Sequence, residues 1–239
     1  SYLAVVGSTE IPGGLRGLNQ VVLSEALEAK ALVKEGKSLK IPRIGETVQG
    51  LFSKLQILGS VGYYRGGPSV GVEASLHGFS QSAETLLKDL EEKRKAANKK
   101  LLAILYRRGL NKTEHIQWFD SGDVYRGMGT KVVGTFCSFI SYQAKLIDPS
   151  KYIMGFMRVP REVPGFGELQ KDYVKVSVRI PKKMQPKIDS GELLNAYELL
   201  LRATADFGVA DGHAYAASAV FAELTNEQFV QRAEDALGR

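Results

Sequence analysis

The sequence is poor in cysteine and histidine, and this limits the chemistry that it can support. Its one cysteine, Cys137, can form neither a disulfide within the chain nor a Cys-x-x-Cys metal site. Because Cys137 lies in the apolar run VVGTFCSFI, we expect a buried structural thiol. The only histidines are His77, His115 and His213, and none has a second histidine nearby with which to share a metal. The sequence therefore predicts no metal site and no cofactor.

Long apolar runs are also missing. No stretch approaches the ~20 residues that a membrane span requires. The N-terminus lacks a basic region followed by an apolar signal core. We therefore expect a cytoplasmic protein without a membrane partner.

The composition is otherwise that of a globular protein, with a modest excess of positive charge. The 239 residues are 44% hydrophobic and 24% charged, enough for one large domain or two small ones. The net charge of +6 favours polyanionic partners, although many proteins that never bind nucleic acid share it. The excess gathers in two basic patches. Residues 88–108 hold eight bases against three acids, and residues 171–187 hold six bases against one acid.

The first part of the chain, residues 1–79, is predicted to be a smaller helical region. Within it, YLAVVGS fits a buried strand or a helix edge, GLNQVVLSEALEAKALV has helical spacing, and residues 46–58 fit a further helix. The glycines and the proline of residues 59–71 indicate a flexible connection. A long connecting helix is predicted over residues 82–108, within a segment of residues 80–112. Its basic residues are either solvated and paired with Glu91 and Glu92 or available to nucleic acid.

Residues 113–239 predict an α+β domain, in which a mixed β-sheet is packed by helices. The segments WFDSG, KVVGTFCSFIS, KYIMGFMRV and DYVKVSVRI are predicted as strands. A helix is predicted over residues 192–207, with Ser190 as its N-cap. Its apolar face is predicted to contain Leu193, Tyr197, Leu200 and Leu201. The last helix is expected to open at Thr225 with a capping box to Gln228.

Two segments of this domain offer candidate binding residues. In DYVKVSVRIP, the alternation places Lys175, Ser177 and Arg179 on one strand face, where the hydroxyl and the guanidinium can hold a phosphate together. The alternative is an exposed polar face with no ligand. In FGVADGHAYAASAV, glycines permit a sharp turn and a close approach to a ligand. If a short helix begins at His213, its N–H groups favour an anion; otherwise His213 is a structural or capping residue.

The order KVSVR, SGELLNAYELLLRATADFG and GHAYAASAV resembles the C-terminal domain of the DHH-family phosphoesterases, which include the RecJ-like nucleases. In that family a strand with Ser-x-Arg precedes a helix and a Gly-Gly-His-x-x-Ala-Ala-Gly motif. The resemblance implies that Ser177 and Arg179 contact a nucleic-acid phosphate. It also implies that Gly212 and His213 line the substrate groove, with Ala216 and Ala217 behind them.

Two positions depart from the motif. Asp211 stands at its first glycine, and Ser218 stands at its last. An acid beside a phosphate repels it, and a side chain in place of a glycine limits the approach of the backbone. The departures therefore weaken the prediction of an intact substrate pocket.

The catalytic half of the family is missing from the sequence. That half uses clustered aspartates and an Asp-His-His run to bind two divalent metals, and the chain contains no such run. Asp120 and Asp123 in DSGD fit a turn better than a metal centre. We therefore expect no catalytic residues. A second resemblance, to the segment that follows the catalytic domain in archaeal RecJ-like proteins, is seen in LAVVGS and GLNQVVLSEALEAK.

Three hypotheses follow. The first is a non-catalytic DNA replication factor similar to the crenarchaeal RecJ-like DNA-binding-domain homologues. This resemblance implies weak to moderate binding of single-stranded DNA. It also implies docking on GINS in the replicative, CMG-type helicase. The second is a fragment of a metal-dependent DHH single-strand exonuclease. The third is a protein-interaction module with a vestigial groove.

Tyr173 and Tyr215 are candidates for base stacking, and residues 63–68 are a candidate docking site.

Overall fold

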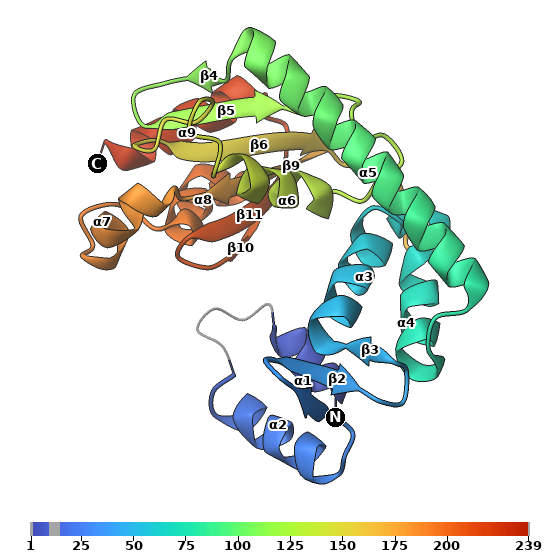
Figure 1. Ribbon diagram of the computed structural model, residues 1–239. Helices are drawn as coiled ribbons and strands as arrows, with labels where there is room; N and C mark the ends of the chain where they lie inside the picture. The colour runs from blue at the N-terminus through green and yellow to red at the C-terminus, as the bar shows by residue number, and fades with distance from the viewer. Residues whose placement is uncertain (1, 10–14, 239) are drawn as a thin grey trace. The chain divides into compact units, whose positions relative to one another are not determined.

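The computed structural model describes residues 2–9 and 15–238. The chain divides into two compact units, Ser1–Arg94 (unit 1) and Lys95–Arg239 (unit 2). Helix α5 (Gln81–Arg108) contributes residues to both units, and it confirms the long helix predicted over residues 82–108 (Figure 1).

Unit 1 combines helices with a small sheet. Its other elements are α1 (Tyr2–Ser8), α2 (Leu18–Glu28), β1 (Val33–Glu35), β2 (Ser38–Ile41), β3 (Glu46–Thr47), α3 (Val48–Ser60), the 3₁₀ helix η1 (Tyr63–Arg65) and α4 (Gly67–His77). The core gathers apolar side chains from α1, α2, β2 and α3, including the fully buried Ala26, Ile41 and Leu51. Helix α3 begins where the side chain of Thr47 accepts a hydrogen bond from the Gly50 N–H, close to the predicted start.

Two expectations for unit 1 are corrected. The region is not only helical, because β1, β2 and β3 form a three-stranded antiparallel sheet. Residues 59–71 are not a flexible connection, because they contain η1 and the first turns of α4. Their glycines serve close packing: a Cβ on Gly67 would lie 2.2 Å from the Leu58 carbonyl oxygen of α3. Small residues let α3 and α4 approach each other closely.

Unit 2 is built on a six-stranded mixed sheet, which confirms the predicted α+β architecture (Figure 1). The strands lie in the order β10-β11-β9-β6-β5-β4, and only β5 and β6 are parallel. The strands are β4 (Asn111–Lys112), β5 (Ile116–Asp120), β6 (Tyr152–Arg158), β9 (Tyr173–Arg179), β10 (Gly208–Gly212) and β11 (Ala216–Ala222). A separate hairpin contains β7 (Glu162–Val163) and β8 (Gly167–Glu168).

Helices cover both faces of this sheet. The helices of unit 2 after α5 are α6 (Lys131–Ile140), η2 (Lys182–Met184), α7 (Gln185–Asp189), α8 (Ala196–Thr204), η3 (Ala205–Phe207) and α9 (Asn226–Leu237). Helices α8 and α9 pack on one face over a core that includes Phe156, Phe221 and Phe229. The rings of Phe221 and Phe229 stack with their centroids 4.3 Å apart. Helix α6 packs against β6 and β9 on the opposite face.

Helix α6 overturns the strand predicted for KVVGTFCSFIS. Its buried residues Val132, Val133, Phe136, Cys137 and Ile140 recur at helical rather than alternate spacing. The β-branched and aromatic residues favoured a strand locally, but packing on the sheet decides the conformation. Cys137 is fully buried, which confirms the predicted structural thiol, and this burial raises its pKa to about 12.

The helix predicted over residues 192–207 is shorter than expected. Helix α8 begins after Asn195, whose side chain accepts from the Glu198 N–H, so Ser190 is not its N-cap. The buried face includes Ala196, Leu199, Leu200 and Ala203. Leu201 is 50% exposed and Tyr197 is 36% exposed, so the prediction that both lie on the apolar face is wrong. The capping box of α9, between Thr225 and Gln228, is confirmed.

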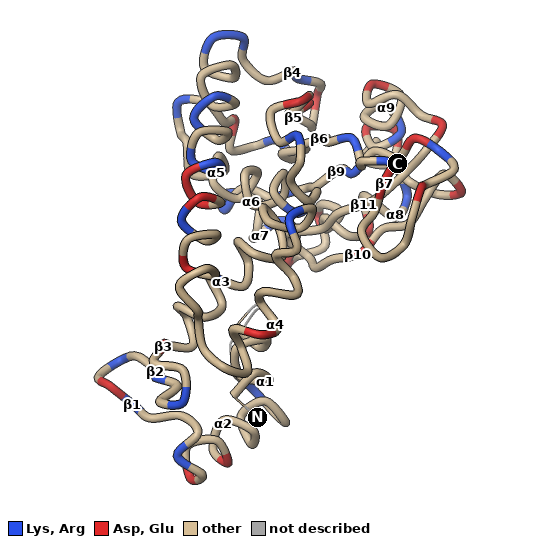
Figure 2. Tube along the Cα trace, turned by 90° about the vertical axis from the view of Figure 1, so that its right-hand side faces the viewer, with Lys and Arg blue, Asp and Glu red and all other residues tan. Residues whose placement is uncertain are grey.

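The bases of α5 lie along a largely exposed helix (Figure 2). Among the described residues, one ion pair joins two side chains of α5, those of Lys93 and Asp89. Asp89 also pairs with Arg65. Of the two alternatives for these bases, pairing with Glu91 and Glu92 is therefore not the one observed. None of the helices in residues 2–9 and 15–238 combines the length and apolarity that crossing a membrane requires.

A largely buried carboxylate links α9 to the start of β5. Glu234 accepts hydrogen bonds from the N–H groups of His115 and Ile116, at 2.9 and 3.1 Å, and from the Thr113 hydroxyl. Its other oxygen lies 2.9 Å from His115 Nδ1. Burial alone raises the pKa of Glu234, but the hydrogen bonds from Thr113 and His115 lower it overall.

We expect Glu234→Gln to lower the free energy of unfolding of unit 2 at neutral pH by about 1–3 kcal/mol, because buried donors lose a charged acceptor. The stabilisation by Glu234 is complete above the pKa of the unfolded carboxyl, about 4.3, and is lost as the pH falls through the lower folded pKa. The variant should therefore lose less stability on acidification than the wild type. The free energy of unfolding at each pH is measured by denaturation followed through the fluorescence of Trp118, the single tryptophan. Glu162→Gln, at an exposed position on β7, is the control. If the free energy of unfolding fell equally with decreasing pH in Glu234→Gln and in the wild type, the role given to Glu234 would be contradicted.

Candidate nucleic-acid interface

The side chains of β9 alternate as predicted between the two faces of the sheet. Val176, Val178 and Ile180 belong to the core beneath α8 and α9. Lys175, Ser177 and Arg179 lie on the opposite face, which we call the basic strand face. This face is not the exposed polar surface of the alternative interpretation, because α6 packs over it. Ser177 is 1% exposed, and Lys175 and Arg179 are half-buried.

Arg179 is held in one orientation. Its Nε donates to Ser138 Oγ of α6 at 2.8 Å, and its Nη1 donates to the Val178 carbonyl oxygen at 2.7 Å. The remaining nitrogen, Nη2, makes no hydrogen bond to any described residue. Two of the three guanidinium nitrogens thus fix the group and leave the third as a donor.

Ser177 Oγ and Arg179 Nη2 meet at Gly134 of α6. A Cβ on Gly134 would lie 3.1 Å from Ser177 Oγ and 3.0 Å from Arg179 Nη2. Within the described chain, Ser177 Oγ also lacks a hydrogen-bond partner. Gly134 therefore lets the helix sit close above two unpaired donors that lie near each other.

The cations of the basic strand face are not neutralised by the described residues. Burial lowers the pKa of Lys175, and the charges of Arg179 and Lys131 lower it further. Burial also lowers the pKa of Arg179. In the described ranges neither cation forms an ion pair with a carboxylate. Half-buried cations without an acid are costly to the fold and are typical of binding sites for anions.

The second predicted segment forms a hairpin, not a helix. His213 lies in the turn between β10 and β11, and its N–H donates to the Ala216 carbonyl oxygen at 2.8 Å. The predicted anion site at a helix N-terminus is therefore wrong, because no helix begins at His213. The residue itself is exposed.

The glycines of this hairpin face their own chain. A Cβ on Gly208 would lie 1.9 Å from the Val220 carbonyl oxygen, and one on Gly212 would lie 2.4 Å from the Ala217 Cα. They permit close pairing of β10 with β11, whereas we expected close approach to a ligand. Gly212, at φ +149°, also adopts a conformation that side chains disfavour. Ala217 is buried in the core, as expected for tight packing.

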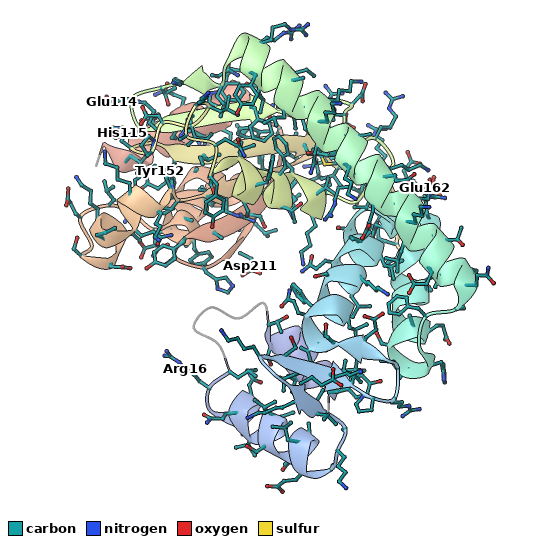
Figure 3. All side chains as sticks on the ribbon, in the orientation of Figure 1. Arg16, Glu114, His115, Tyr152, Glu162 and Asp211 are labelled. Atoms are coloured by element: carbon teal, nitrogen blue, oxygen red, sulfur yellow. The ribbon has the colours of Figure 1, made fainter. Side chains whose placement is uncertain are left out.

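Strand pairing brings the two motif departures beside Ser177. Ser177 on β9 pairs with Ser218 on β11, and Ser218 pairs with Asp211 on β10. Residues in register across neighbouring strands lie on the same face, so these three form one row. Ala210 packs on the α8–α9 core, which agrees with Asp211 on the opposite face. Asp211 is exposed, and Figure 3 shows it at the edge of the sheet.

A parallel row connects Arg179 with the hairpin turn. Arg179 pairs with Ala216, and the His213 N–H binds the carbonyl of Ala216. The structure thus places the predicted residues Ser177, Arg179, Gly212 and His213 on neighbouring strands and their turn. Lys175 lies on the same face of β9, one step beyond Ser177.

Two residues that complete this site, Gly134 and Ser138, come from α6 and were not among the predicted site residues. Gly134 and Ser138 both contact Arg179, but their segment was predicted as a strand. The helical spacing of Val132, Phe136 and Ile140 was the available signal.

The predicted aromatic and docking residues are only partly available. The Tyr215 hydroxyl donates to Asp189, and its ring packs against the core, so it is not a free stacking platform. Tyr173 is half-buried. In residues 63–68, Arg65 is ion-paired with Asp89, and the rings of Tyr63 and Tyr64 contact each other edge to face.

The described residues contain no cluster of three or more His, Cys, Asp or Glu side chains that could hold a metal. Asp120 ends β5 and accepts from the Gly122 N–H at 2.8 Å, as expected for a turn. His115, labelled in Figure 3, contacts Glu234 and precedes β5, whereas Asp120 is the last residue of that strand.

The fold is similar to those of two solved structures. RecJ from Thermus thermophilus, in complex with Mg²⁺, superposes with a TM-score of 0.57 at 17% identity, over 98% of this chain and 33% of RecJ. The chain has a RecJ-like fold. A structure described as the DHH domain of a member of the S1P family of ribosomal proteins matches with a TM-score of 0.51 at 13% identity, over 98% of this chain and 49% of that protein.

The chain therefore spans about a third of RecJ and about half of the second protein. No family model matches the sequence, and no curated protein matches it. The similarity to RecJ is thus one of fold, in line with the resemblance of the motifs in β9 and the β10–β11 hairpin.

Proposed function

We propose that this chain is a non-catalytic, RecJ-like DNA replication factor that binds single-stranded DNA through unit 2. The observation that carries the proposal is the basic strand face. There, Arg179 Nη2 and Ser177 Oγ lie together without partners among the described residues, and Lys175 adds a second unpaired cation. The half-buried guanidinium of Arg179 is suited to a phosphodiester oxygen pair. The Ser177 hydroxyl beside it is only 1% exposed beneath α6, so Arg179 and Lys175 are the groups proposed to contact the phosphate.

The half-buried cations also give a reason why the binding of a phosphate is favourable. Burial lowers the pKa of Lys175 most, and repulsion by Arg179 and Lys131 lowers it further; a phosphate between Lys175 and Arg179 would offset that repulsion. Affinity should consequently fall as the pH rises through the lowered pKa of Lys175, since the neutral amine no longer attracts the phosphate.

The replication role and the partner come from the resemblance of the motifs. The order of KVSVR, the following helix and GHAYAASAV is similar to that in RecJ-like proteins, and the Asp-His-His run of the catalytic half is missing from the sequence. Such non-catalytic crenarchaeal homologues dock on GINS in the replicative helicase. We therefore propose GINS as the protein partner of this chain.

The proposal is tested by titrating the purified chain with oligo-dT at two salt concentrations, with and without manganese, and analysing the DNA afterwards. We expect salt-sensitive binding, with a slope of about −0.7 in log K against log salt for each phosphate neutralised. The DNA should stay intact. Release of nucleotides with manganese would overturn the non-catalytic assignment and favour a DHH nuclease fragment.

Partner docking is tested separately by size-exclusion chromatography of the chain with purified GINS. Co-elution supports the replication role. If GINS does not co-elute but DNA binds, the partner is wrong and DNA binding stands. If GINS co-elutes and DNA does not bind, the chain is a protein-interaction module with a vestigial groove.

A further inference from the structure

Asp211 introduces a negative charge into the row that ends at the basic strand face. Ser177, Ser218 and Asp211 are in register on β9, β11 and β10. Because neighbouring strands lie about 4.8 Å apart, the Cα atoms of Ser177 and Asp211 are separated by about 10 Å. A phosphate bound at Arg179 Nη2, which lies beside Ser177, would therefore be on the order of 10 Å from the Asp211 carboxylate. That is about one Debye length at 0.1 M salt and well inside the Debye length of about 30 Å at 0.01 M salt.

No described cation neutralises this carboxylate. Asp211 Oδ1 accepts from the N–H of Gly212 at 2.8 Å, which holds the carboxylate near the backbone of β10. Across the described part of the chain, Asp211 forms no ion pair with a Lys, Arg or His side chain. Its charge therefore acts on any anion bound beside it.

The two kinds of DNA phosphate respond differently to such a charge. An internal phosphodiester carries one negative charge, whereas a terminal phosphate monoester carries about −1.5 to −2 at pH 7. The carboxylate repels the monoester more strongly. The hydroxymethyl side chain of Ser218, between Ser177 and Asp211, further fills the space that a glycine would leave beside the site.

We propose that Asp211, with Ser218, makes the basic strand face select internal phosphodiesters of single-stranded DNA over terminal phosphates. This inference rests on the proposed DNA-binding function and adds the part of the strand that is bound. Asp211 acts as a specificity-determining residue by repulsion, while Arg179 provides the attraction. The face would then bind along a strand without engaging its phosphorylated end.

The test compares hexamers of dT that carry either a 5′-phosphate or a 5′-hydroxyl. The quantity of interest is the affinity for the 5′-phosphate hexamer divided by the affinity for the 5′-hydroxyl hexamer. For the wild type we expect this ratio to be at or below one. Asp211→Asn keeps the size and the acceptor for the Gly212 N–H, and it should raise this ratio about two- to fivefold at low salt. The increase should shrink at 0.5 M salt, since the Debye length there is only about 4 Å.

Glu162→Gln provides the matched control, because it removes one exposed carboxylate from a different part of unit 2 (Figure 3). Its ratio should equal that of the wild type. Equal ratios in the wild type and Asp211→Asn, whatever their value, would overturn the inference and leave DNA binding intact. If neither the hexamers nor an end-free circular single strand bind to the wild type, the proposed function itself fails, and the inference fails with it.

Discussion

Replacing Arg179 by alanine is expected to lower the affinity for single-stranded oligo-dT by about tenfold or more, because hydrogen bonds to a charged group contribute about 1.5–3 kcal/mol. The variant also removes one phosphate-neutralising cation, so the salt slope should become shallower by about 0.7. Fluorescence anisotropy of labelled DNA at several salt concentrations measures both quantities.

Arg126→Ala is the matched control for this loss. Arg126 lies in the same unit, its side chain is 79% exposed, and it pairs with Asp123 in a turn. Its removal should leave DNA affinity nearly unchanged, because Arg126 is already paired with Asp123 and lies outside the basic strand face. Arg179→Lys keeps the charge but loses the fork held by Ser138 and Val178, so it should recover only part of the affinity.

Because Arg179 is half-buried, folding of the variant must be shown independently. Trp118 is the single tryptophan and lies in the core of unit 2, so its fluorescence reports this unit alone. A folded Arg179→Ala protein with wild-type DNA affinity would exclude the basic strand face as the binding site.

Gly155→Val is expected to destabilise unit 2 by about 3 kcal/mol, which is the upper range for overpacking a core. A Cβ on Gly155 would lie 2.6 Å from Cys137 Sγ, 2.7 Å from Phe119 Cζ and 3.0 Å from Val133 Cγ2. These atoms belong to buried residues, so α6 would have to move away from β6. Denaturant unfolding followed by Trp118 fluorescence gives the change in free energy.

The same substitution should also weaken DNA binding, because α6 carries the Ser138 hydroxyl that orients Arg179. Gly238→Ala is the control, since its Cβ would make only an ordinary contact, 3.8 Å from the Glu234 carbonyl oxygen. Unchanged stability in Gly155→Val would mean that α6 does not pack on β6 as described.

Features that depend on a few neighbouring residues were predictable from the sequence. The capping box at Thr225 needs only the next three residues, and the alternation along β9 needs only the strand itself. The length and start of α5 followed from apolar residues at helical spacing. In each case the local pattern and the tertiary packing favour the same structure.

Features decided by distant contacts were not predictable. The α6 segment has strand-forming residues, but it is helical because its apolar face covers β6 and β9. The strands β1 to β3 are two to four residues long and carry no clear alternation. His213 lies in a hairpin because residues 208–212 pair with residues 217–221.

The candidate site shows the same division. The sequence predicted that Ser177 and Arg179 share a face, but only the fold shows that α6 covers this face through Gly134. It also shows that the two departures from the family motif, Asp211 and Ser218, are cross-strand partners. They are not neighbours in the sequence, so their adjacency requires the β10–β11 register.

The central claim is that DNA binds at Arg179, and NMR of the arginine side chains tests it most directly. The Nε–H resonance of Arg179, assigned by its loss in Arg179→Lys, should shift when oligo-dT is added to the wild-type chain. The resonance of Arg126 should not shift. A protein that binds oligo-dT while the Arg179 resonance stays unchanged would contradict the account, because the phosphate would then lie elsewhere.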